Sequence, residues 1–117
     1  MTWKGRPIAV IVVACLYLLV GVAGLIGHFP ELLARHPDAV SIEATELLAL
    51  LAGLFLLRGA NWARWLALAW MAFHVVISFF HPIRELAIHA LLLAVIAWAL
   101  LRPASAQYFT DPQRPVV

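Results

Sequence analysis

The sequence predicts an all-α integral membrane protein, a four-helix bundle with antiparallel up-and-down topology. Apolar residues make up 65% of the 117-residue chain and charged residues 12%, against about 45–50% and about 25% in soluble domains. A soluble domain of this size buries only about 60–70% of its unfolded surface, which would leave too much apolar surface in water. The apolar residues also fall in four long runs, separated by short segments that carry most of the charges.

The first span covers about residues 7–27. A short lead with Lys4 and Arg6 precedes an uninterrupted apolar run, and helical residues at about 1.5 Å each cross a hydrocarbon core of about 30 Å in this length. A cleaved secretory signal is the alternative, but its apolar region is typically about 7–15 residues long. The residues before Cys15 loosely resemble a lipoprotein cleavage box, although the apolar run continues far beyond it. We favour a retained helix.

The second span covers about residues 41–57. Ser41 is expected to cap its start, because a serine side chain can accept a hydrogen bond from a free backbone N–H of the first turn. Glu43 and Glu46 fall in the first turns, where the helix dipole favours negative charge. The connection before this span is the longest one, and its residues 30–35 could form a short helix at the membrane interface.

The third span covers about residues 62–80 and follows a turn so short that the second and third spans form an antiparallel hairpin. Pro82 ends it, because proline lacks a backbone donor and disfavours helix in the residue before it. The fourth span covers about residues 83–101. The four spans make a single domain, residues 1–103, and residues 104–117 are expected to be a polar, poorly ordered cytoplasmic tail.

The Lys and Arg residues predict the orientation. Six of them share the side that holds both termini and the turn between the second and third spans, and two lie on the other side. Cytoplasmic loops carry the excess of such residues, so both termini should be cytoplasmic. Most acidic residues fall on the outer side: Glu31, Asp38, Glu43, Glu46 and Glu85.

Helical spacing gathers polar groups at the outer end of the bundle. In the third span, His74, Ser78 and His81 share one stripe with small residues nearer the cytoplasmic end. Small residues let helices approach closely in lipid, and polar residues there face protein or a cavity. We therefore predict close packing at the cytoplasmic end and an outward-facing polar cup. The predicted lining of the cup is His28, Glu43, Glu46, His74, Ser78, His81, His89 and Tyr17. The predicted helix-packing residues are Gly21, Gly24, Gly53, Ala63, Ala67, Ala90 and Ala94.

Several kinds of chemistry fit such a cup. Imidazole and carboxylate groups bind transition metals, with His74, His81 and His89 as candidate ligands, and His74 with His89 could hold a haem or a chlorin. Buried His and Glu groups can also relay protons or hydrogen-bond a quinone. The simplest alternative is that these groups sit at the outer water interface. The sequence requires no cofactor.

Two function classes lack support in the sequence. Ser78 has no nucleophile-elbow context and no other catalytic motif is present, which favours a protein that is not an enzyme. The basic residues stand singly at the ends of apolar runs, and no basic patch with interleaved aromatic residues indicates nucleic-acid binding.

From Glu46 to Leu68 the chain reads ELLALLAGLFLLRGANWARWLAL. A glutamate begins this part of the second span, a glycine lies within it, Arg58 and Gly59 form the turn, and an Arg-Trp pair opens the third span. This stretch resembles the DoxX and DoxX-like group of small four-span bacterial membrane proteins. The resemblance implies a location in the bacterial cytoplasmic (inner) membrane and a redox-associated or respiratory subunit, and it transfers no catalytic residue.

The functional expectation is an accessory or lipophile-binding subunit whose cup takes a quinone-like molecule. Its expected partners are the lipid bilayer and a redox or respiratory membrane complex or a second copy of itself. An oligomeric transporter or channel is the first alternative, since four spans alone leave little room for a pore. A haem- or metal-carrying electron-transfer subunit is the second.

Overall fold

A computed structural model describes residues 6–110, and this part of the chain is all α-helical, as the sequence predicts. Its helices are α1 (Ile8–Leu33), α2 (Ala39–Leu57), α3 (Asn61–Ser78), α4 (Ile83–Leu101) and α5 (Pro103–Thr110). Three of them, α1, α2 and α4, are long and apolar enough to cross a membrane. This finding supports the prediction of a membrane protein. The helix α3 contains Asn61, Arg64 and His74 and is not in that set.

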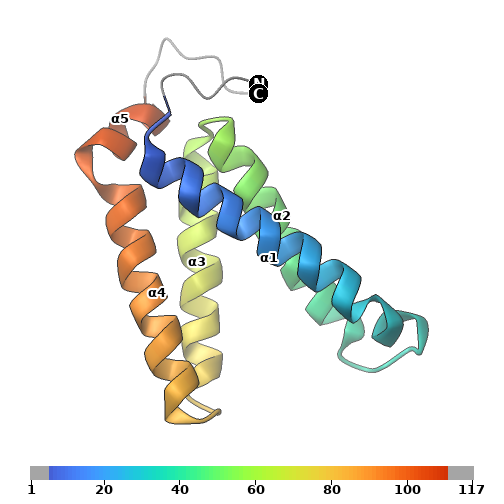
Figure 1. The fold of residues 1–117 in the computed structure, drawn as a ribbon. Helices are drawn as coiled ribbons and strands as arrows, with labels where there is room; N and C mark the ends of the chain where they lie inside the picture. The colour runs from blue at the N-terminus through green and yellow to red at the C-terminus, as the bar shows by residue number, and fades with distance from the viewer. Residues whose placement is uncertain (1–5, 111–117) are drawn as a thin grey trace.

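The four long helices form two antiparallel hairpins, α1 with α2 and α3 with α4 (Figure 1). The hairpins meet at the end that holds residues 58–60 and α5, which we call the closed end. They diverge toward the end that holds residues 34–38 and 79–82, which we call the open end (Figure 1). The arrangement is thus a pair of hairpins that lie close together at one end and are splayed at the other.

Glycines allow the close packing of α1 on α2. A Cβ atom built at Gly21 would lie 2.8 Å from the backbone nitrogen of Leu50, and one at Gly53 would lie 2.8 Å from the carbonyl oxygen of Ala14. Real Cβ atoms do not approach backbone atoms so closely. The two helices can therefore lie at this distance because neither position carries a side chain.

The hairpins are joined through small residues of α3. Ala63 and Ala67 are fully buried, and the hydroxyl of Tyr17 on α1 donates a hydrogen bond to the carbonyl of Ala67. The prediction for α4 differs from the structure, because Ala90 and Ala94 are exposed. This helix packs inward through other residues, and its buried side chains are Ile96, Ala99 and Leu100.

Two helix boundaries on the hairpin of α1 and α2 also differ from prediction. The expected interfacial helix at residues 30–35 is the last part of α1, which continues through Pro30 to Leu33. The helix α2 begins at Ala39, so Ser41 lies inside it and does not cap it. The carbonyl of Ser41 instead accepts a hydrogen bond from the hydroxyl of Thr45, one turn later.

The segment after Arg102 forms the helix α5, where we expected a poorly ordered tail; residues 111–117 of that tail lie outside the described range. Proline at the first helical position suits a helix start. The Ser105 hydroxyl donates to the carbonyl of Ala99, and the Tyr108 hydroxyl donates to the carbonyl of Leu57. Because the last carbonyls of a helix lack partners within it, α5 satisfies one such group near the end of α4 and another at the end of α2.

Candidate ligand-binding pocket

A cavity of about 270 Å³ lies between the hairpins, and each of the four long helices contributes to its wall. Most of the lining is apolar, with a small number of polar side chains, which is the usual composition of a small-molecule site. The lining residues are Leu16, Tyr17, Val20, Glu46, Trp70, Met71, His74, His89 and Leu92.

His74 is held against its own helix. Its Nδ1 lies 2.9 Å from the carbonyl oxygen of Trp70, and its ring centroid lies 3.9 Å from that of the Trp70 indole. A carbonyl can only accept, so we assign the proton of the neutral imidazole to Nδ1. The Nε2 atom of His74 then carries a lone pair and acts as a hydrogen-bond acceptor.

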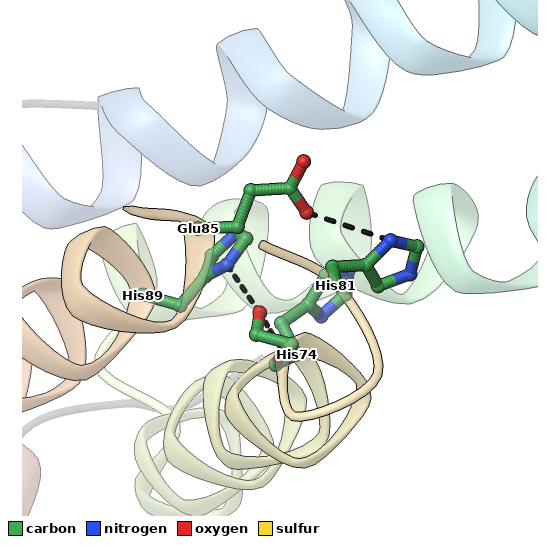
Figure 2. A network of polar contacts seen from close by, with 5 residues as sticks. His74, His81, Glu85 and His89 are labelled. Atoms are coloured by element: carbon green, nitrogen blue, oxygen red, sulfur yellow. Dashed lines mark hydrogen bonds and ion pairs between the residues drawn. The ribbon is translucent and has the colours of Figure 1, made fainter. Parts of the chain in front are cut away.

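His89 is held by Ser78 across the α3–α4 hairpin, as the dashed line in Figure 2 marks. The Ser78 Oγ lies 2.7 Å from the carbonyl oxygen of His74 and 2.6 Å from Nδ1 of His89. The hydroxyl has one hydrogen, which it donates to the carbonyl, so it accepts from Nδ1–H of His89. This assignment again leaves Nε2 as the acceptor. The two imidazole centroids are 6.0 Å apart.

Glu46 brings a carboxyl group to the same cavity from α2. The carboxyl packs directly against Gly24 of α1, where a Cβ atom would overlap it. One oxygen of Glu46, Oε2, is buried and has no hydrogen-bond partner within residues 6–110, and the same holds for Oε1 of Glu43. A buried polar atom without a partner is costly, and of these two residues only Glu46 lines the cavity.

The remaining polar atoms of the wall already have backbone partners. The Tyr17 hydroxyl donates to the carbonyl of Ala67, and the Trp70 Nε1–H donates to the carbonyl of Thr45 at 2.8 Å. The two rings lie 5.3 Å apart, centroid to centroid, with an interplanar angle of 60°. Tyr17 and Trp70 therefore offer aromatic surface to the cavity, with their hydrogen atoms directed into hydrogen bonds elsewhere.

The structure brings half of the predicted cup together. Tyr17, Glu46, His74 and His89 line the cavity, and Ser78 supports His89 from behind. The other predicted residues do not line it. His28 binds the carbonyl of Gly24 in its own helix at 3.0 Å, and exposed His81 pairs with Glu85 at 3.7 Å (Figure 2). Glu43 is also absent from the lining.

Sequence reasoning missed the part played by Trp70. This residue lies one turn before His74 on the same stripe of α3, and it contributes both an aromatic wall and the carbonyl that holds the imidazole. The spacing of four residues between Trp70 and His74 was the signal in the sequence that could have placed the two side chains next to each other. No comparable signal in the sequence pairs Ser78 with His89.

No group of three or more His, Cys, Asp or Glu side chains within the described residues is placed to hold a metal ion. Of the three predicted ligands, His74 and His89 line the cavity and His81 does not. Comparison of the chain with protein-family models, with curated proteins and with solved structures found no match.

Proposed function

We propose that this is a four-span protein of the bacterial cytoplasmic membrane whose pocket binds a small, ring-containing lipophile of the quinone type. In this proposal the protein is an accessory subunit of a redox or respiratory membrane complex, with both termini in the cytoplasm. The pocket with its buried, unpartnered Glu46 oxygen carries the ligand-binding part of the proposal.

The short connection between α2 and α3 supports a fourth span. Residues 58–60 are the whole connection, so α3 starts where α2 leaves the bilayer. Its 18 residues rise about 27 Å at about 1.5 Å per residue, close to the hydrocarbon thickness of about 30 Å. The helix can accommodate its polar residues because His74 and Ser78 face other helices. A return across the membrane is the simplest path for the chain.

The size of the pocket favours a ligand with one or two rings. An apolar cavity of about 150 Å³ can hold benzene, so about 270 Å³ accommodates a substituted ring. A haem macrocycle is much larger than this space. The size of the cavity therefore makes a haem-carrying subunit the weaker candidate.

Tryptophan fluorescence of the purified protein in lipid nanodiscs tests the proposal, with duroquinone as the probe, because quinones quench a neighbouring indole. We expect a saturable component of quenching that disappears in Trp70→Phe. Trp65→Phe is the matched control, because Trp65 lies on the same helix and is 52% exposed.

A second pair of variants tests the pocket itself. Val20 lines the cavity and Val22 is exposed on the same helix, so Val20→Phe should abolish the saturable component and Val22→Phe should retain it. Quenching that rises linearly with duroquinone, with no difference between the two variants, would show that the probe dissolves in the bilayer and does not enter the pocket.

A further inference from the structure

The pocket presents hydrogen-bond acceptors, and the donors of its wall are already engaged. Tyr17 O–H and Trp70 N–H bind backbone carbonyls. The Nδ1–H groups of His74 and His89 bind a carbonyl and the Ser78 oxygen. The atoms that remain are the two imidazole Nε2 atoms and the oxygens of Glu46.

These acceptors have no hydrogen-bond partner within residues 6–110. The hydrogen bonds of His74 and His89 all involve Nδ1 and leave Nε2 unbound. Glu46 Oε2 is buried and unbound. The residues that carry them come from α2, α3 and α4 and line one cavity. A single molecule in that cavity can therefore meet more than one of them.

We propose that the occupant is a hydrogen-bond donor, a phenol or hydroquinone whose hydroxyl groups bind the Nε2 atoms of His74 and His89 and the carboxyl of Glu46. This inference rests on the proposed function, since it names the chemical form of ligand that the same pocket prefers. The oxidised form, a quinone, carries carbonyl acceptors. Its oxygen atoms would face the lone pairs of the imidazoles and the carboxyl and would find no donor.

We expect a large difference in affinity between a ligand with a hydroxyl donor and one without it. A ligand without the donor leaves the imidazole nitrogens and the carboxyl of the pocket unpaired. A site that hydrogen-bonds a ligand hydroxyl rejects the analogue that lacks it far more strongly than a hydrophobic pocket rejects a missing methylene. Loss of one such bond corresponds to a change of about tenfold in the dissociation constant. A neutral Glu46 would add one donor and would still leave both imidazole nitrogens as acceptors.

Three ligands with one ring skeleton test the inference: 2,3,5,6-tetramethylphenol, its methyl ether and duroquinone. Calorimetric titration into protein-loaded nanodiscs, corrected with empty nanodiscs, gives each dissociation constant. We expect the phenol to bind at least about tenfold more tightly than the ether and the quinone. Equal affinities, or tighter binding of the quinone, would overturn the donor preference and leave the pocket proposal standing. No saturable binding of any of the three would overturn both.

Variants assign the preference to particular atoms. His74→Phe should bring the ratio of the ether and phenol dissociation constants toward one, and so should His89→Phe. His81→Phe is the matched control, because His81 lies outside the cavity and is exposed. An unchanged ratio in a folded His74→Phe protein would contradict the assignment.

Glu46→Gln gives an independent test that preserves the size of the side chain. The amide brings N–H donors into the cavity, so duroquinone affinity should rise relative to that of the phenol. If this variant leaves the preference for the phenol unchanged, Glu46 does not take part in recognition.

Discussion

Gly24 of α1 lies directly against the carboxyl group of Glu46 on α2, in the space that a side chain at position 24 would fill. The sequence suggested that Gly24 lets two helices approach. In the structure it makes room for an acidic side chain, and that side chain reaches the cavity between the hairpins. A glycine on one helix thus positions a polar group of the other.

Gly24→Ala should weaken ligand binding more than it weakens the fold. The added methyl group meets the end of a flexible side chain, so Glu46 can rotate away at a cost of roughly 1 kcal/mol for a strained rotamer. We expect tetramethylphenol to bind several-fold more weakly in calorimetric titrations. Gly27→Ala is the control, since a Cβ atom there meets nothing within 4 Å. Equal affinities of the two variants would show that Gly24 does not position Glu46.

Gly21→Ala and Gly53→Ala should destabilise the fold itself. Their added methyl groups meet the backbone of Leu50 and the carbonyl of Ala14 at 2.8 Å, and backbone atoms cannot rotate away as a side chain does. Overpacking of this kind costs about 1–3 kcal/mol. Unfolding in mixed micelles with increasing SDS measures the loss against Gly27→Ala. Stabilities equal to that of the control would mean that α1 and α2 separate at little cost.

The helical class and the division of the chain into helices follow directly from its apolar runs, and the range predicted for the fourth span coincides with α4. The face by which α4 packs could not be predicted in the same way. In lipid, both an alanine stripe and an Ile-containing stripe can face another helix, because apolar side chains are equally acceptable to the bilayer. Exposed Ala90 and buried Ile96 show which stripe packs within the chain.

The residues of the candidate site could likewise be predicted only in part. The stripe predicted for the third span includes His74 and Ser78, and in the structure His74 lines the cavity and Ser78 binds His89 of its wall, because helical periodicity determines which residues share a face. The same periodicity does not apply to His81, since α3 ends at Ser78 and the chain turns before residue 81. The contact of Ser78 with His89 depends on how α4 crosses α3. Periodicity within one helix contains no information on that crossing.

The helix α5 should depend on its two hydroxyl contacts to other helices. Ser105→Ala removes the hydrogen bond to Ala99, and Tyr108→Phe removes the one to Leu57. Each change should cost about 0.5–1.5 kcal/mol, the net value of a typical hydrogen bond. We expect faster hydrogen exchange of the α5 amides, measured by mass spectrometry. Thr110→Ser is the control, because Thr110 is exposed and its hydroxyl binds a carbonyl within α5. Unchanged exchange in both variants would show that these two hydrogen bonds do not hold α5 in place.

The predicted orientation can be tested by labelling single cysteines in intact cells with a reagent that does not cross the membrane. The native Cys15 is exposed on α1, so Cys15→Ser provides the background. His36 lies in the open-end loop and Asn61 at the closed end, and both are exposed. Neighbouring Ala60 is fully buried and would escape labelling in either orientation, which makes Asn61 the informative position.

His36→Cys should react in intact cells, whereas Asn61→Cys should react after permeabilisation. This result follows from the excess of basic residues at the closed end, where Arg6, Arg58, Arg64 and Arg102 lie, because such residues are retained on the cytoplasmic side. The reverse pattern would place the open end in the cytoplasm. Labelling of both positions from outside would mean that α2, which lies between them, does not cross the membrane, and it would overturn the four-span topology.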